Sequence, residues 1–156
     1  MRSLVLLFCI GAGLGNAQNA DEKAVTATVQ KLFDAMAAHD SGAARAVLLP
    51  EGLMLASPGE GPLHSSTQEQ FAARIGGLKD ALLERMWNPK VLVQGRIAHV
   101  WAEYDFWRNG KFGHCGIDSF SLLKTADGWK IAGTSYTIQT SGCAPSPLGP
   151  PPSSQQ

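Results

Sequence analysis

Hydrophobic residues recur at helical spacing near the start of the chain. This period predicts an amphipathic helix over residues 21–38, in which Asp21 and Glu22 complement the helix dipole of the first turn. Asp40 or Ser41 then caps a short second helix that Pro50 stops. The apolar positions of the first helix are Val25, Val29, Leu32, Phe33 and Met36.

The hydrophobic pattern changes to strand-like segments in the second half of the chain. Before that change, residues 52–57 read as a short strand, and the capping box in residues 66–69 opens a helix. Pro89 indicates a bulge or an edge position in the first long strand. Two turn sequences, Asn109-Gly110 and Asp127-Gly128, predict hairpins. The long strands are expected over residues 80–93, 96–107, 112–124 and 129–140.

The two ends of the chain differ from its middle. Residues 1–17 combine a positive residue, a short apolar run and small residues at the end, which is the pattern of a secretory signal peptide cut after Ala17. Its apolar run is too short to span a bilayer, so no stable membrane anchor is expected. Residues 144–156 are rich in Pro and Ser and are expected to be disordered. The protein is therefore expected to be secreted or periplasmic.

Helices followed by a long antiparallel meander predict an α+β domain over residues 21–143, in which N-terminal helices pack on the concave face of a curved, cone-shaped sheet. The element order and the stretch "WAEYDFWRNGKFGHCGIDSFSLLKTADGWKI", Trp101 to Ile131, resemble the nuclear transport factor 2-like superfamily. This superfamily includes ketosteroid isomerases and SnoaL-like cyclases, and the stretch is most similar to its putative lumazine-binding branch. The resemblance implies the cone fold, which hosts unrelated activities.

The composition of the chain argues against several classes of function. Thirteen basic and thirteen acidic residues give a formal net charge of zero, which argues against a nucleic-acid partner. No CxxC motif is present, and no cofactor or metal site is indicated. His114 and Asp118 lie four residues apart in one strand, about 13 Å, and cannot chelate one metal ion.

The hairpin turns set a strand register from which candidate site residues follow. If the residue numbers of opposed pairs sum to 219 across Asn109-Gly110, Asp105 faces His114 and Trp101 faces Asp118. If they sum to 253 in the next hairpin, Asp118 faces Ser135. One face then carries polar groups among aromatic rings, as ligand pockets do. The predicted pocket residues are Trp101, Asp105, His114, Asp118, Phe120, Trp129 and Ser135, with Asp118 as the candidate catalytic residue.

The two cysteines that follow the predicted signal peptide are Cys115 and Cys143. His114 and Cys115 are strand neighbours on opposite faces, so they do not form a nucleophile pair. In an oxidising compartment the two cysteines are expected to form a disulfide. The register places Ile138 opposite Cys115, so the bond requires the chain to fold back after Gln139.

Three functions remain open at this stage. The first is a binding module for a small hydrophobic molecule, with Asp118 and His114 at its polar end. The second is an isomerase- or cyclase-type enzyme that moves a proton with a pocket carboxylate; the first helix lacks the tyrosine that a ketosteroid isomerase would need, and the register puts Tyr104 and Tyr136 on the other face. The third is a homodimer through an apolar row on that other face, made of Val100, Tyr104, Phe106, Ile117 and Tyr136.

Overall fold

The computed structural model describes residues 13–151. Most of the predicted signal peptide and the last five residues of the predicted tail lie outside these residues. The helices are α1 (Gly13–Ala38), α2 (Ser41–Val47) and α3 (Gln68–Gly77). The strands are β1 (Leu48–Pro58), β2 (His64–Thr67), β3 (Leu82–Gln94), β4 (Ile97–Arg108), β5 (Lys111–Thr125) and β6 (Gly128–Ile138).

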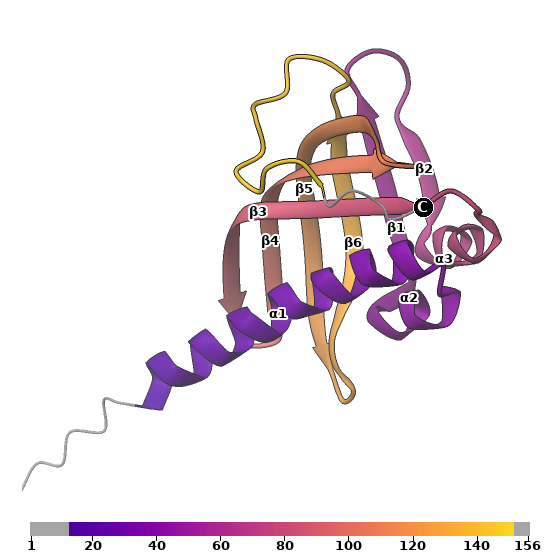
Figure 1. The fold of residues 1–156 in the computed structure, drawn as a ribbon. Coiled ribbons are helices and arrows are strands. Elements are labelled where there is room, and N and C mark those ends of the chain that lie inside the picture. Colours follow the sequence, from indigo (N-terminus) through magenta and orange to yellow (C-terminus); the bar gives the residue numbers. More distant parts are fainter. Residues whose placement is uncertain (1–12, 152–156) are drawn as a thin grey trace, which may run out of the picture.

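The six strands form one curved sheet that stays open, in the order β2-β1-β6-β5-β4-β3. All neighbours are antiparallel except β1 and β6, which run parallel. Helix α1 crosses one face of the sheet, and α2 and α3 lie at one end of that helix (Figure 1). The expected α+β class, with helices on the concave face, is confirmed. One strand was not expected: β2 falls in a segment that the sequence pattern assigns to a loop.

Most local signals in the sequence act where they were expected, although the capping box of α3 lies one residue later than predicted. Asp40 caps α2 by accepting a hydrogen bond from the backbone of Ala43, and the capping box of α3 is made by Thr67 and Gln70. Asn109 and Gly110 both have positive φ, as the hairpin turn between β4 and β5 requires. Pro89 lies in the edge strand β3 at an irregularity of its pairing with β4.

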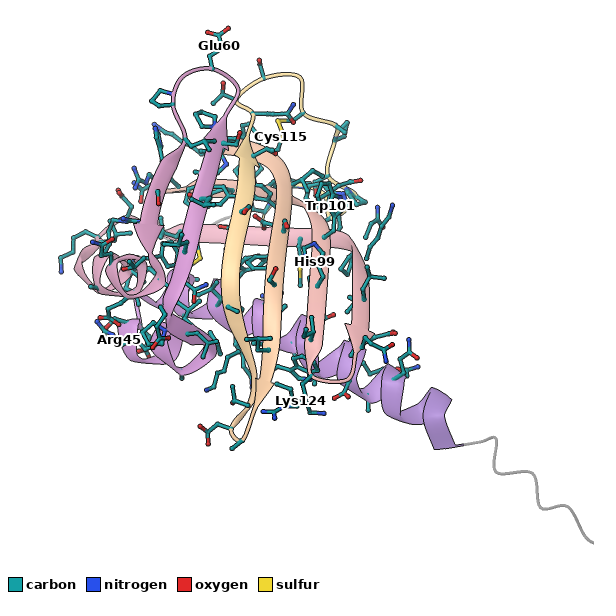
Figure 2. All side chains as sticks on the ribbon, turned by 180° about the vertical axis from the view of Figure 1, so that it is seen from behind. Arg45, Glu60, His99, Trp101, Cys115 and Lys124 are labelled. Atoms are coloured by element: carbon teal, nitrogen blue, oxygen red, sulfur yellow. A yellow bond between two sulfur atoms is a disulfide. The ribbon has the colours of Figure 1, made fainter. Side chains whose placement is uncertain are left out.

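The hydrophobic core lies between the helices and the concave face, which we call the inner face. Leu32 and Phe33 of α1 pack against inner-face residues such as Phe120 and Leu122. None of the three described helices covers the opposite, outer face of the sheet (Figure 2). Trp101 stands on this outer face with 48% of its surface exposed. The two faces of one sheet are thus solvated very differently.

The expected disulfide joins Cys115 to Cys143, with 6.1 Å between the Cα atoms. The chain pairs Gln139 with Cys115 and then turns back, with Gly142 at positive φ. Residues 144–151 continue beside β3 and β4, where Arg85 donates a hydrogen bond to the carbonyl of Gly149. Whether this part of the tail is mobile stays a prediction.

Candidate functional site

The strand register differs from the prediction at two bulges, and this changes the face on which several residues lie. The β4–β5 hairpin begins with the expected pairs, but Phe106 then faces His114, so Gly113 is an extra residue. Beyond it, Asp118 faces Ala102 instead of Trp101. In the next hairpin Ala132 is extra, and Asp118 faces Tyr136 instead of Ser135. A one-residue shift moves side chains to the other face of a strand.

The predicted pocket residues therefore divide into three groups. Asp118, Phe120 and His114 lie on the inner face; the first two line a cavity beneath the helices, and His114 lies farther along the same strand. Trp129 is buried at the far end of the core, where its indole donates to Asp21. Trp101, Asp105 and Ser135 belong to the outer face, so the prediction that they share a face with Asp118 is wrong.

The predicted dimer row is also wrong. Val100 and Tyr104 share the inner face with Asp118 and are buried there. Phe106 packs against the core, and Tyr136 lines the same cavity as Asp118. Only Ile117 of that row lies on the outer face, among the residues of a shallow groove beside Trp101.

The cavity of the inner face is about 30 Å³, room for one or two water molecules. Apolar side chains of α1, α3 and β1 make up most of its wall, and its polar groups come from three strands. Those polar residues are Glu84, Asp118, Thr134 and Tyr136, and the apolar ones are Leu32, Phe33, Met36, Met54, Phe71 and Phe120.

Two carboxyl groups meet in this cavity. Asp118 is only 2% exposed and lines the cavity together with Glu84, and its Oδ2 atom has no hydrogen-bond partner among the described residues. Two carboxyl groups can share a hydrogen bond only if one of them is protonated. Burial, followed by the charge of Glu84, raises the pKa of Asp118 well above its usual range. The surroundings of Asp118 therefore favour its protonated form.

Burial also raises the pKa of Glu84, to about 7. Hydrogen bonding to a protonated Asp118 opposes this rise in the pKa of Glu84, because it favours the Glu84 carboxylate. Both carboxyl groups thus have raised pKa values, and that of Glu84 lies near neutral pH. Pairs of titratable groups whose pKa values are pushed apart are typical of acid–base sites.

A second polar chain runs along the inner face next to this pair. The Tyr104 hydroxyl donates to the backbone oxygen of Thr137 at 2.7 Å, and it lies 3.0 Å from His114 Nδ1. Since the hydroxyl hydrogen is used by the carbonyl, His114 must donate from Nδ1 to the Tyr104 oxygen. This leaves Nε2 of the neutral ring as an acceptor. Burial lowers the pKa of His114, which favours that neutral form.

The predicted pocket lacks four polar residues of this candidate site, namely Glu84, Thr134, Tyr104 and Tyr136. The shift caused by Gly113 hid the tyrosines, although a glycine inside a strand is itself a signal for a bulge. Glu84 lies in β3, to which the register derived from the two hairpin turns did not extend. No short-range pattern in the sequence connects Glu84 with Asp118.

Within residues 13–151, no three His, Cys, Asp or Glu side chains come close enough together to hold a metal ion. None of the helices in this range is both long and apolar enough to cross a membrane.

Comparison with protein families identifies the class to which this fold and site belong. A family model described as "Putative lumazine-binding" matches residues 20–137. The chain therefore belongs to that family, within the nuclear transport factor 2-like superfamily that the sequence resembles. A search of curated proteins finds no match.

Solved structures show the same fold. The chain is similar to a putative dehydratase of the NTF2-like family from Streptomyces avermitilis, with a TM-score of 0.65 and 16% identity over 80% of this chain and 99% of that one. An NTF2-like protein with a cystatin-like fold from Novosphingobium aromaticivorans gives 0.66 and 16%, over 84% and 89%. A protein of unknown function from Silicibacter pomeroyi gives 0.62 and 22%, over 80% and 98%.

Proposed function

We propose that the protein binds a small molecule inside the cone, with the Glu84–Asp118 pair holding its polar end. The buried pair is the observation that carries this proposal. A carboxylate next to a protonated carboxyl offers one acceptor and one donor side by side. A ligand that carries an N–H group beside a carbonyl complements both. Lumazine, a pteridinedione named in the family description, has that pattern.

Binding in the cone requires side chains to move, because 30 Å³ is far below the 300–1,000 Å³ of ordinary ligand pockets. Met36 and Met54 are unbranched and adapt readily to a new neighbour. Phe71 and Tyr136 are only partly buried, which makes them the side of the cavity nearest to solvent. We therefore expect a ligand to enter between α3 and β6.

Titration calorimetry with lumazine tests the proposal. Asp118→Asn keeps the shape of the side chain but fixes a donor and removes the shared proton. We expect it to weaken binding at least tenfold, and Glu84→Gln to do the same. Ser135→Ala, an exposed outer-face change, serves as the control. Equal affinity in the wild type, Asp118→Asn and Glu84→Gln would show that lumazine does not use this pair.

Proton-transfer catalysis is the second candidate, favoured by the raised pKa values of the two carboxyl groups. Glu84, with its pKa of about 7, would take a proton from a carbon next to a carbonyl, and Asp118 would donate a hydrogen bond to the enolate oxygen. Glu84 would then return the proton to the far (γ) carbon of the resulting dienolate, and the double bond would move into conjugation with the carbonyl. The corrected register also removes one objection, because both Tyr104 and Tyr136 share the face of Asp118.

Isomerisation of androst-5-ene-3,17-dione, followed by ultraviolet absorbance, distinguishes catalysis from binding. An isomerase should lose activity in Glu84→Gln and show a pH profile that rises near 7, as the base loses its proton. Binding of the steroid without turnover would favour the binding module.

A homodimer through the outer face is a separate proposal. Its support is the exposed surface of Trp101 and Leu53 on a sheet face that none of the described helices covers. Analytical ultracentrifugation of the wild type and Trp101→Ser tests it. A wild type that stays monomeric at high micromolar concentration rules it out.

We also propose that the protein is exported after removal of residues 1–17. The support is the charge and hydrophobicity pattern of that segment. The intact mass of the exported protein should match a chain that begins at Gln18. Recovery of the uncut chain from the cytosol would contradict this.

A further inference from the structure

A second cavity lies on the outer face of β3 and β4, away from the cone. Its volume is about 370 Å³, more than ten times that of the cone and within the range of ligand pockets. Its floor is formed by side chains of β3, β4 and β5. Its roof is the C-terminal segment of residues 143–150, which we call the strap.

The strap is held over the floor at two points. The disulfide from Cys115 fixes its start, and the hydrogen bond from Arg85 to the Gly149 carbonyl, at 3.0 Å, holds it near its end. Figure 2 shows Cys115 on β5, close to the C-terminal segment that turns back over the edge of the sheet. The roof is thus attached to the same strands that form the floor.

The floor of this cavity is aromatic. Trp87, Trp107 and Phe112 line it, and the rings of Trp107 and Phe112 meet edge to face with their centres 5.5 Å apart. The Arg85 guanidinium lies over the Trp107 ring at 5.8 Å. Flat aromatic surfaces of this kind favour a flat aromatic guest, which gains stacking energy that an aliphatic one does not.

The two charged side chains that line this cavity neutralise each other. Arg85 binds Asp105 through two hydrogen bonds, of 2.9 and 2.6 Å; the Asp105 side chain is buried, and that of Arg85 is 12% exposed. This pair leaves no net charge to attract an ion. The indole N–H of Trp87 donates to Glu103, whereas the indole N–H of Trp107 is buried and finds no acceptor among the described residues. A buried donor without an acceptor carries a cost that a ligand with an acceptor would remove.

We propose that the cavity beneath the strap binds a neutral, planar aromatic molecule that accepts a hydrogen bond from Trp107 Nε1. The site is independent of the cone, since the inner and outer faces are separated by the sheet. The aromatic floor selects the planar ring system, and the neutralised ion pair selects against charged ligands. The indole donor selects a carbonyl or ring-nitrogen acceptor on the guest.

Nuclear magnetic resonance of the indole N–H groups tests this inference in the full, disulfide-bonded chain. Lumichrome and flavone serve as planar probes with carbonyl acceptors, and cyclohexanecarboxamide as a non-aromatic comparison. Trp107→Phe identifies the Trp107 signal by its disappearance. We expect the planar probes to shift that signal saturably downfield and the comparison compound to leave it unchanged.

Two variants locate the probe. Phe112→Ala removes a half-exposed wall of the cavity, and we expect it to weaken probe binding at least tenfold; Trp101→Phe, elsewhere on the outer face, is the matched control. Failure of both planar probes to shift the Trp107 signal overturns the inference. So does binding that Asp118→Asn abolishes and Phe112→Ala leaves intact, because that pattern places the probe in the cone.

Discussion

Two aspartates on neighbouring strands are almost equally buried and yet have opposite surroundings. Asp118 is 2% exposed on the inner face and meets another carboxyl group, Glu84. Asp105 is 3% exposed on the outer face and meets the guanidinium of Arg85. Burial alone therefore does not decide what a carboxyl group does in this sheet. The partner decides whether it is held as a stable anion or as a protonated acid.

The difference assigns separate roles to the two faces. An ion pair with two hydrogen bonds is a structural arrangement, because each charge satisfies the other. Two like groups that must share a proton destabilise the folded state as the pH rises, and proteins keep such pairs mainly at functional sites. The inner pair is therefore the better candidate for chemistry, and the outer pair supports the wall of an uncharged cavity.

The largest effect should come from removing the cation of the outer pair. Arg85→Ala leaves Asp105 buried without its partner, which typically costs about 3–5 kcal/mol. Urea denaturation at pH 7 measures the free energy of unfolding. The matched control is Arg45→Ala, which breaks the exposed Arg45–Glu69 pair and should cost no more than about 1 kcal/mol. Equal losses in the two variants would show that the burial of Asp105 does not matter.

Removal of the disulfide should be nearly as costly. The bond closes a loop with a sequence separation of 28, for which the chain-entropy model gives roughly 3–4 kcal/mol. The double variant Cys115→Ala/Cys143→Ala, measured by urea denaturation, tests this value. The loss should be the same at pH 5 and pH 8, unlike an effect at the inner pair. A strong pH dependence would mean that the strap affects the carboxyl groups.

The inner pair should make stability fall as the pH rises from about 5 to 8. The raised pKa values mean that the folded state keeps protons that the unfolded chain has already lost above its ordinary carboxyl pKa. Stability then decreases with pH until both groups have passed their folded pKa values. We expect a decline on the order of 1–3 kcal/mol, because one unit of pKa shift is worth about 1.4 kcal/mol. Denaturation series at several pH values measure it.

Replacing each of the two aspartates by asparagine should have opposite effects on the free energy of unfolding. Asp118→Asn supplies a permanent N–H donor to Glu84, so it should flatten the pH dependence and stabilise the protein at pH 8 by about 1–2 kcal/mol. Asp105→Asn removes a charge from the outer pair and should destabilise the protein at the same pH. If both variants stabilised the protein, or both destabilised it, the proposed difference between the two aspartates would be wrong.

The sequence predicts the helices, the hairpin turns, the disulfide and the position of Asp118 within a strand, because each depends on short-range signals. It does not predict which partner Asp118 meets. That depends on single extra residues, Gly113 and Ala132, which reverse the faces of everything beyond them. It also depends on the curvature of β3, which brings Glu84 to Asp118 from 34 residues away in the chain.

The smallest effect concerns the neutral polar chain of the inner face. Tyr104→Phe removes one hydroxyl that bonds both the Thr137 carbonyl and His114, and should cost about 1 kcal/mol in the free energy of unfolding. Its sharper readout is the His114 ring. In the wild type the Nδ1–H form is fixed by donation to Tyr104, and without the hydroxyl the hydrogen has no reason to stay on Nδ1. Nitrogen chemical shifts of the ring should show Nδ1–H in the wild type and mainly Nε2–H in Tyr104→Phe. An unchanged tautomer would mean that Tyr104 does not set the orientation of His114, and that the inner face is organised by the carboxyl pair alone.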